Sequence, residues 1–183
     1  MWRFRHDLPE DICEALELYC QAEPFTTSDR PEYEDEYIRI LSAHTPVHRL
    51  WLGPAYWFSN GAAAASEPTL IDEQNAALLK DSLPDWIADV RHQQPFYAMI
   101  VEGQAIAVCA SVRITDEAHE AGVETLASHR RKGYAVSVIS AWASTVEKLG
   151  ALPLYSTSID NMLSQKVAAR VGLSRYGVDF HIA

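Results

Sequence analysis

Gly122-Val-Glu-Thr-Leu-Ala-Ser-His-Arg-Arg-Lys-Gly-Tyr-Ala135 is the stretch that decides the fold of this chain. A short β-type run ends here, basic residues and a glycine follow, and a long amphipathic helix begins at once. This order brings unpaired backbone N–H groups, a helix N-terminus and the cations Arg130, Arg131 and Lys132 to one place. These are the parts of a phosphate or pyrophosphate site. A solvated basic turn before a surface helix is the alternative for the motif taken alone.

Helical spacing of apolar residues predicts helices on both sides of this stretch. The helix after the basic turn begins near Gly133 and ends at Gly150. A later helix, capped by Asp160 or Ser158, stops at Gly172. Upstream helices are expected within residues 1–47 and over residues 71–90, where Pro84 splits the segment.

Apolar runs bounded by turn residues predict the strands. The strongest signal is a hairpin of residues 96–101 and 105–114, joined by the turn Glu102-Gly103-Gln104. A polar loop reaching His119 leads to the next strand. The remaining strands are expected over residues 50–58, 120–126, 152–157 and 176–182. Strands flanked by helices on a mixed sheet indicate the α/β or α+β class.

The composition is that of a globular protein with an acidic surface. The chain has 183 residues, 48% hydrophobic and 22% charged, which suits one domain with a core and excludes disorder. A net charge of −10 disfavours nucleic acid and favours a cationic small molecule or basic peptide, although solubility alone also explains it.

Targeting signals and cysteine usage predict a reduced, cytoplasmic protein without a membrane partner. No apolar run reaches the ~20 residues of a membrane helix, and the first residues lack a secretory apolar region. Cys13, Cys20 and Cys109 are odd in number and lack a metal-binding spacing, so neither a disulfide framework nor a metal is expected.

The order of these elements and motifs resembles the GNAT superfamily of N-acetyltransferases, which bind acetyl-coenzyme A. The pieces that carry the resemblance are Glu120-Ala-Gly-Val-Glu-Thr125, Arg130-Arg-Lys-Gly-Tyr-Ala135, Pro153-Leu-Tyr-Ser-Thr-Ser158, Asn161-x-x-Ser164 and Gly172-Leu173. Each piece is weak alone, and their shared order and spacing makes the resemblance specific. It implies a GNAT-like acetyltransferase domain over residues 48–183, with a mixed, mostly antiparallel sheet and splayed central strands, and a helical N-terminal extension over residues 1–47.

The resemblance also implies where acetyl-coenzyme A (acetyl-CoA) would bind. Thr125 and Leu126 would bind the pantetheine amide by strand-like backbone hydrogen bonds. Asn161 and Ser164 would approach the pantetheine arm and the thioester. Gly133 would let the backbone approach a phosphate oxygen where a Cβ would clash. The pyrophosphate loop would use mainly the backbone N–H groups of Arg130, Arg131, Lys132, Gly133, Tyr134 and Ala135.

The sequence departs from the family pattern at two positions. The family often has glycine after its first arginine, where this chain has Arg131. It also often has, seven residues after the asparagine, a tyrosine that protonates the leaving thiolate; here that position is Ala168. Tyr155, Ser164 or a water could serve as the acid instead.

A general base is the larger chemical need. An alkylamine with a pKa near 10.4 lies ~3.4 pH units from neutrality, about 4.6 kcal/mol, whereas protonating a thiolate of pKa near 8.5 gains only about 2 kcal/mol. The candidates are Glu120, Glu124 and His119, and we prefer Glu120. The two glutamates share one strand face, where both could equally be solvent-facing acids. His119 fits better as a loop histidine.

The remaining aromatic residues and Cys109 can be interpreted either as core residues or as parts of a functional site. Tyr56, Trp57, Trp51 and Trp86 fit core packing better than the wall of an acceptor pocket, and Cys109 fits the core.

The leading hypothesis is therefore acetyl transfer to a primary amine of a small molecule or peptide, by direct attack on the thioester. A non-catalytic acyl-CoA-binding or regulatory module is the alternative. Another class of nucleotide binder is disfavoured because the chain has no G-x-x-x-x-G-K-[ST] motif. The acceptor stays open, and the family resemblance leaves a homodimer open.

Overall fold

The computed structural model describes residues 2–24, 28–59 and 67–183, and their contacts divide the chain into two compact units. The first unit contains Met1–Ala55, Ser158–Asp160 and Arg175–Ala183. The second contains Tyr56–Thr157 and Asn161–Ser174. The expected boundary between an extension and a domain at residue 47 stays a prediction. Among the described residues, no helix has both the length and the apolar character needed to cross a membrane.

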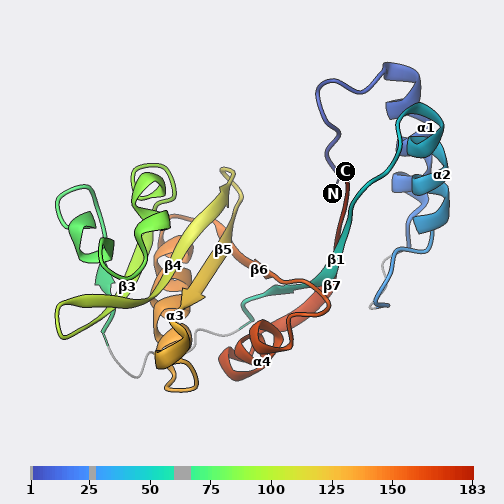
Figure 1. The fold of residues 1–183 in the computed structure, drawn as a ribbon. Coiled ribbons are helices and arrows are strands. Elements are labelled where there is room, and N and C mark those ends of the chain that lie inside the picture. Colours follow the sequence, from blue (N-terminus) through green and yellow to red (C-terminus); the bar gives the residue numbers. More distant parts are fainter. Residues whose placement is uncertain (1, 25–27, 60–66) are drawn as a thin grey trace. The chain divides into compact units, whose positions relative to one another are not determined.

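The first unit joins a helical pair to two strands. The helices α1 (Glu10–Ala22) and α2 (Glu34–His44) pack against each other (Figure 1). Leu16, Tyr37 and Ile40 form the buried centre of this packing, and Phe180 contacts it. The strands are β1 (Leu50–Trp57) and β7 (Ser174–Ile182), most of whose residues lie in this unit.

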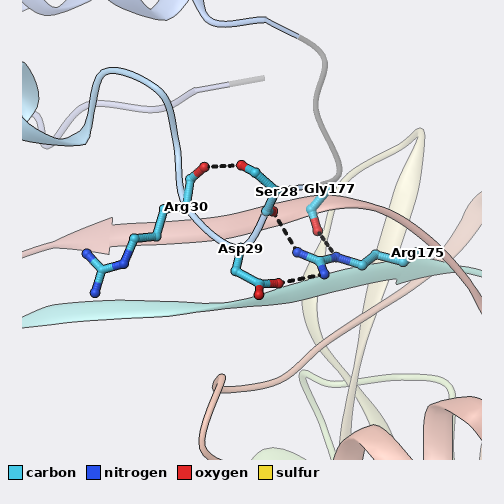
Figure 2. Close-up of polar contacts among 5 residues, drawn as sticks. All are labelled: Ser28, Asp29, Arg30, Arg175 and Gly177. Atoms are coloured by element: carbon cyan, nitrogen blue, oxygen red, sulfur yellow. Dashed lines mark hydrogen bonds and ion pairs between the residues drawn. The ribbon is translucent and has the colours of Figure 1, made fainter.

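Hydrogen bonds from Arg175, near the start of β7, link this strand to the segment before α2 (Figure 2). Its guanidinium donates to Asp29 Oδ1 at 2.8 Å and to the carbonyl of Ser28 at 2.7 Å. Its Nε donates to the carbonyl of Gly177 at 3.3 Å. One side chain therefore holds together two segments that lie far apart in the sequence.

The second unit is built on a sheet with the strand order β2-β3-β4-β5-β6. The pairs β2–β3, β3–β4 and β4–β5 are antiparallel, and β5–β6 is parallel. The expected mixed, mostly antiparallel sheet is confirmed, as is the hairpin of β3 and β4. The strands are β2 (Thr69–Leu70), β3 (Phe96–Val101), β4 (Gln104–Ile114), β5 (Ala118–Thr125) and β6 (Leu152–Ser156).

Alternation along the strands divides the second unit's core into two layers. One face of this sheet is covered by α3 (Tyr134–Lys148) (Figure 1). On this face, Cys109 and its neighbours pack against α3, whose apolar stripe includes Trp142. On the opposite face, Val108 and Phe96 pack against the short 3-10 helices η1 (Ala76–Leu79) and η2 (Pro84–Asp89). The last helix is α4 (Met162–Val171).

Three sequence expectations need correction. The segment over 71–90 is split at Pro84 into two short helices as expected, but both are 3-10 helices, η1 and η2, and they cover only part of the segment. His119 is a strand residue, because β5 begins at Ala118 where it pairs with β6. The cap of α4 is Asn161, whose Oδ1 accepts from the N–H of Ser164 at 3.1 Å.

Candidate functional site

Strands β5 and β6 run side by side for only a short distance. Their parallel register covers Ala118↔Leu152, His119↔Pro153 and Glu120↔Leu154. Beyond Glu120, β5 continues to Thr125, and among the described residues no further pair with β6 follows. The expected splay between central strands is therefore present, and Glu120 lies at its vertex.

The end of β5 turns into the basic loop through a network of backbone contacts. Leu126 donates its N–H to Ile106 and accepts from the N–H of His129. Arg130 Nε donates to the carbonyl of Thr125 at 3.2 Å. Both main-chain groups of Leu126 are thus used within the protein, and the Arg130 side chain ties the loop to the strand.

Two left-handed residues shape the basic loop. Arg131 has φ +64°, and Gly133, which precedes the first residue of α3, has φ +90°. A Cβ at Gly133 would meet no atom of the described residues within 4 Å, so the backbone angle is what requires glycine here. The loop delivers the chain into α3, whose first N–H groups, beginning at Tyr134 and Ala135, have no intrahelical partner.

The charged side chains of this loop differ in their roles. Arg131 and Lys132 are exposed, and within the described part of the chain neither makes a hydrogen bond or ion pair. Arg130 instead bonds to the backbone. Two uncompensated cations thus stand beside a helix N-terminus in a protein whose net charge is −10.

Glu120 is the more constrained of the two glutamates among the candidate bases. Its Oε2 lies 3.0 Å from Arg113 Nη1, and its Oε1 accepts a hydrogen bond from Ser156 Oγ. Sequence reasoning missed both partners. The signal that could have found Arg113 was the polar end of an otherwise apolar strand, and Ser156 lay within the Pro153–Ser158 piece.

Glu124 lies on the same face of β5 and makes a different contact. Its Oε2 accepts from the indole Nε1 of Trp86 at 2.6 Å. The Trp86 ring also lies close to Gly122, since a Cβ built there would be 3.1 Å from Trp86 Cη2. The indole of Trp86 therefore lies over β5 near Gly122 and Glu124, on the sheet face opposite α3.

His119 belongs to a buried polar chain under α3. Trp142 Nε1 donates to Ser111 Oγ at 3.0 Å, and Ser111 Oγ lies 2.9 Å from His119 Nδ1. Because an indole N–H can only donate, the hydroxyl hydrogen of Ser111 is left to donate to His119 Nδ1. Burial lowers the pKa of His119, so the ring is neutral at pH 7. The ring's place under α3 favours packing over proton transfer at the splay.

The structure brings together the two candidate acids. Tyr155 on β6 is 3% exposed, and its hydroxyl is hydrogen-bonded to Ser164 Oγ on α4. Burial raises the pKa of Tyr155, which keeps the phenol protonated. Asn161, the third family-matched residue here, is exposed and caps α4. Ala168 is fully buried in the core.

The remaining candidates divide between core and surface. Cys109 is fully buried, and burial raises the pKa of its thiol, so it is packed as a core residue. The ring of Tyr56 is tilted against that of Tyr155, with 6.3 Å between the ring centroids, whereas Trp57 is exposed. Trp51 lies in the first unit, where its ring contacts His181. No group of His, Cys, Asp or Glu within the described ranges could hold a metal ion.

Residues 92–177 match the family model described as GNAT acetyltransferase. Among solved structures, a GNAT-family protein from Novosphingobium aromaticivorans is similar over 73% of this chain and 64% of its own, with 16% identity and a TM-score of 0.59. A GCN5-related N-acetyltransferase-like protein from Streptococcus suis is similar over 80% of this chain and 66% of its own, with 15% identity and a TM-score of 0.58. The matched part of this chain thus spans slightly less than two thirds of either structure.

A third structure, an acetyltransferase from the GNAT family of Colwellia psychrerythraea, is similar over 100% of this chain and 74% of its own. Its identity is 15% and its TM-score 0.56. No curated protein matches the sequence. These structures share the fold, and the family model covers the splay and the basic loop. Over residues 92–177 the chain matches the GNAT acetyltransferase family, and its fold is that of GNAT-family structures.

Proposed function

We propose that the protein transfers an acetyl group from acetyl-CoA to a primary amine of a small molecule or peptide, by direct attack on the thioester. The observation that carries this proposal is the splay that opens at Glu120 and leads to the basic loop. A bound thioester would supply the activated acetyl group.

The residues of the splay fit an extended, phosphate-bearing cofactor. Thr125 Oγ1, at the end of β5, is buried and has no hydrogen-bond partner among the residues that the structure describes, and a pantetheine amide would pass here. Arg131, Lys132 and the first N–H groups of α3 are available for a diphosphate. One charge-assisted hydrogen bond there would contribute roughly 1.5–3 kcal/mol.

The proton steps can be assigned to groups at the two sides of the splay. Glu120, at the vertex, would accept the proton of the amine directly or through water, with Glu124 as the second candidate. Tyr155, kept protonated by burial and bonded to Ser164, would supply a proton to the departing thiolate. α3 covers the other sheet face, so the acceptor would approach from the face of Glu120, Glu124 and Trp86.

One observation favours the alternative of a non-catalytic acyl-CoA-binding module. Ala168 stands where the family often has its acid, and it is fully buried in the core. Under this alternative, the protein would bind acyl-CoA without turnover, and Glu120→Gln and Glu124→Gln would not weaken that binding.

Release of free thiol from acetyl-CoA, followed over a panel of primary amines, tests the proposal against this alternative. Turnover of an amine, lowered at least tenfold by Glu120→Gln with an unchanged KM for acetyl-CoA, is the expected result. Measurable coenzyme A binding with no turnover of any amine would reject the transferase in favour of the binding module.

A further inference from the structure

Three strands meet at the carboxylate of Glu120. Arg113 on β4 contacts one of its oxygens at 3.0 Å, and Ser156 on β6 donates to the other. The side chain of Glu120 is 14% exposed, while that of Arg113 is 54% exposed. The carboxylate at the vertex of the splay is therefore held from two sides and largely shielded from solvent.

A β-bulge in β4 places Arg113 where it can make this contact. Ser111 pairs with Ala121, but the next pair is Arg113 with Glu120, so Val112 is an extra residue. In a regular ladder Val112 would lie opposite Glu120, and Arg113 would lie opposite His119, on the face that α3 covers. The bulge turns the guanidinium to the face from which the acceptor would approach.

We infer that Arg113 and Ser156 are positioning residues, which fix the carboxylate of Glu120 for proton transfer. This inference rests on the acetyl transfer proposed above. A glutamate side chain has three rotatable bonds. If the carboxylate is already held in one orientation, the conformational entropy of orienting it is not lost again in each turnover. Each carboxylate oxygen keeps a second lone pair, which can accept from the acceptor amine or from a water.

Arg113→Met is the main test, with thiol release as the assay. We expect kcat to fall about tenfold or more, with the KM for acetyl-CoA unchanged, because the cofactor contacts lie elsewhere in the splay. Arg113→Lys keeps the charge but loses the planar fork, so it should recover part of the activity. Arg91→Met is the matched control, because Arg91 makes an exposed ion pair with Glu73 at 3.9 Å in the same unit.

Two further measurements separate positioning from a merely structural role. Guanidinium ion added to Arg113→Ala should restore part of kcat, whereas sodium chloride at equal ionic strength should not. In a double-mutant cycle, Arg113→Met should cost little once Glu120→Gln is present, because the group that it positions is gone. Ser156→Ala provides a second variant if Arg113→Met fails to fold, and it should also lower kcat without raising the KM for acetyl-CoA.

The outcomes distinguish this inference from the proposed function. A wild-type protein that turns over no amine rejects the transferase, and the role of Arg113 falls with it. Wild-type turnover with an unchanged kcat in both Arg113→Met and Ser156→Ala rejects the positioning role alone. A raised KM for the acceptor with an intact kcat would instead make Arg113 a binding group for the acceptor, and it too would overturn the inference.

Discussion

Arg131 occupies a left-handed backbone conformation, with φ +64°, that costs an L-residue about 1–2 kcal/mol. The family often has glycine at this place, and the observed angle explains why glycine suits it. The chain keeps an arginine here, and its side chain is exposed beside the N-terminus of α3. Strain of this kind is typically retained where the side chain contributes to function.

We expect Arg131→Gly to weaken coenzyme A binding several-fold while the free energy of unfolding changes by less than about 1 kcal/mol. The relieved strain and the greater freedom of glycine in the unfolded chain oppose each other in stability. Titration calorimetry and denaturant unfolding measure the two quantities. Lys132→Met is the control, because it removes one positive charge from the loop without changing a left-handed residue. Equal coenzyme A affinity in Arg131→Gly and the wild type would contradict the expectation.

Gly122 is required by close packing and has no left-handed backbone angle. A Cβ there would lie 2.2 Å from Val112 Cγ1 and 3.1 Å from Trp86 Cη2. Gly122→Ala should therefore displace the bulge residue or the indole and lower the free energy of unfolding by about 1–3 kcal/mol. Gly177→Ala is the control, because a Cβ there would meet no atom of the described ranges within 4 Å, and it should stay near wild type in the same unfolding experiment.

At the scale of elements, the cap of α4 offers a direct comparison. Asn161→Ala removes the hydrogen bond to the N–H of Ser164 and should cost about 1 kcal/mol of unfolding free energy. Asp160→Ala, at the neighbouring exposed residue that the sequence pattern also offered as a cap, should cost less than about 0.5 kcal/mol. Equal losses in denaturant unfolding would remove the distinction between them.

The elements that the sequence predicted are those whose patterns are local. The stripe of α3 repeats at helical spacing between Gly133 and Gly150, and the hairpin turn contains Glu102 and Gly103, which both adopt positive φ. The splay and the basic loop, by contrast, were expected because the order of the sequence motifs resembles that of a known family.

The errors arise where tertiary pairing decides the outcome. His119 joins β5 because its partner, Pro153, lies on a strand that follows later in the chain. The contact of Arg113 with Glu120 depends on the register shift at Val112, and alternation along β4 alone would place the arginine on the other face. The polar end of β4 marks Arg113 itself, but no local pattern marks the register shift at Val112 or the pairing of His119 with Pro153.

For the whole molecule, the burial of His119 sets a pH dependence of stability. Its folded-state pKa lies below the ordinary value of about 6.5, because burial disfavours the charged ring. The unfolded chain therefore binds this proton more readily, and the free energy of unfolding should fall as pH drops below about 6.5. His119→Asn should flatten this part of the profile, measured by denaturant unfolding between pH 7.5 and pH 5.

The control for this profile is His92→Asn, at an exposed histidine of the same unit. It should reproduce the wild-type dependence. A His119→Asn profile parallel to the wild-type profile would show that other groups cause the loss of stability in acid.

The first unit takes its residues from both ends of the sequence, which has a consequence for synthesis. Helices α1 and α2 are translated before the strands of the second unit, and Phe180, whose ring centroid lies 6.4 Å from that of Tyr37, is translated after those strands. The apolar side of the helical pair therefore stays uncovered until β7 has been synthesised. Until then it is an exposed apolar surface that chaperones could bind.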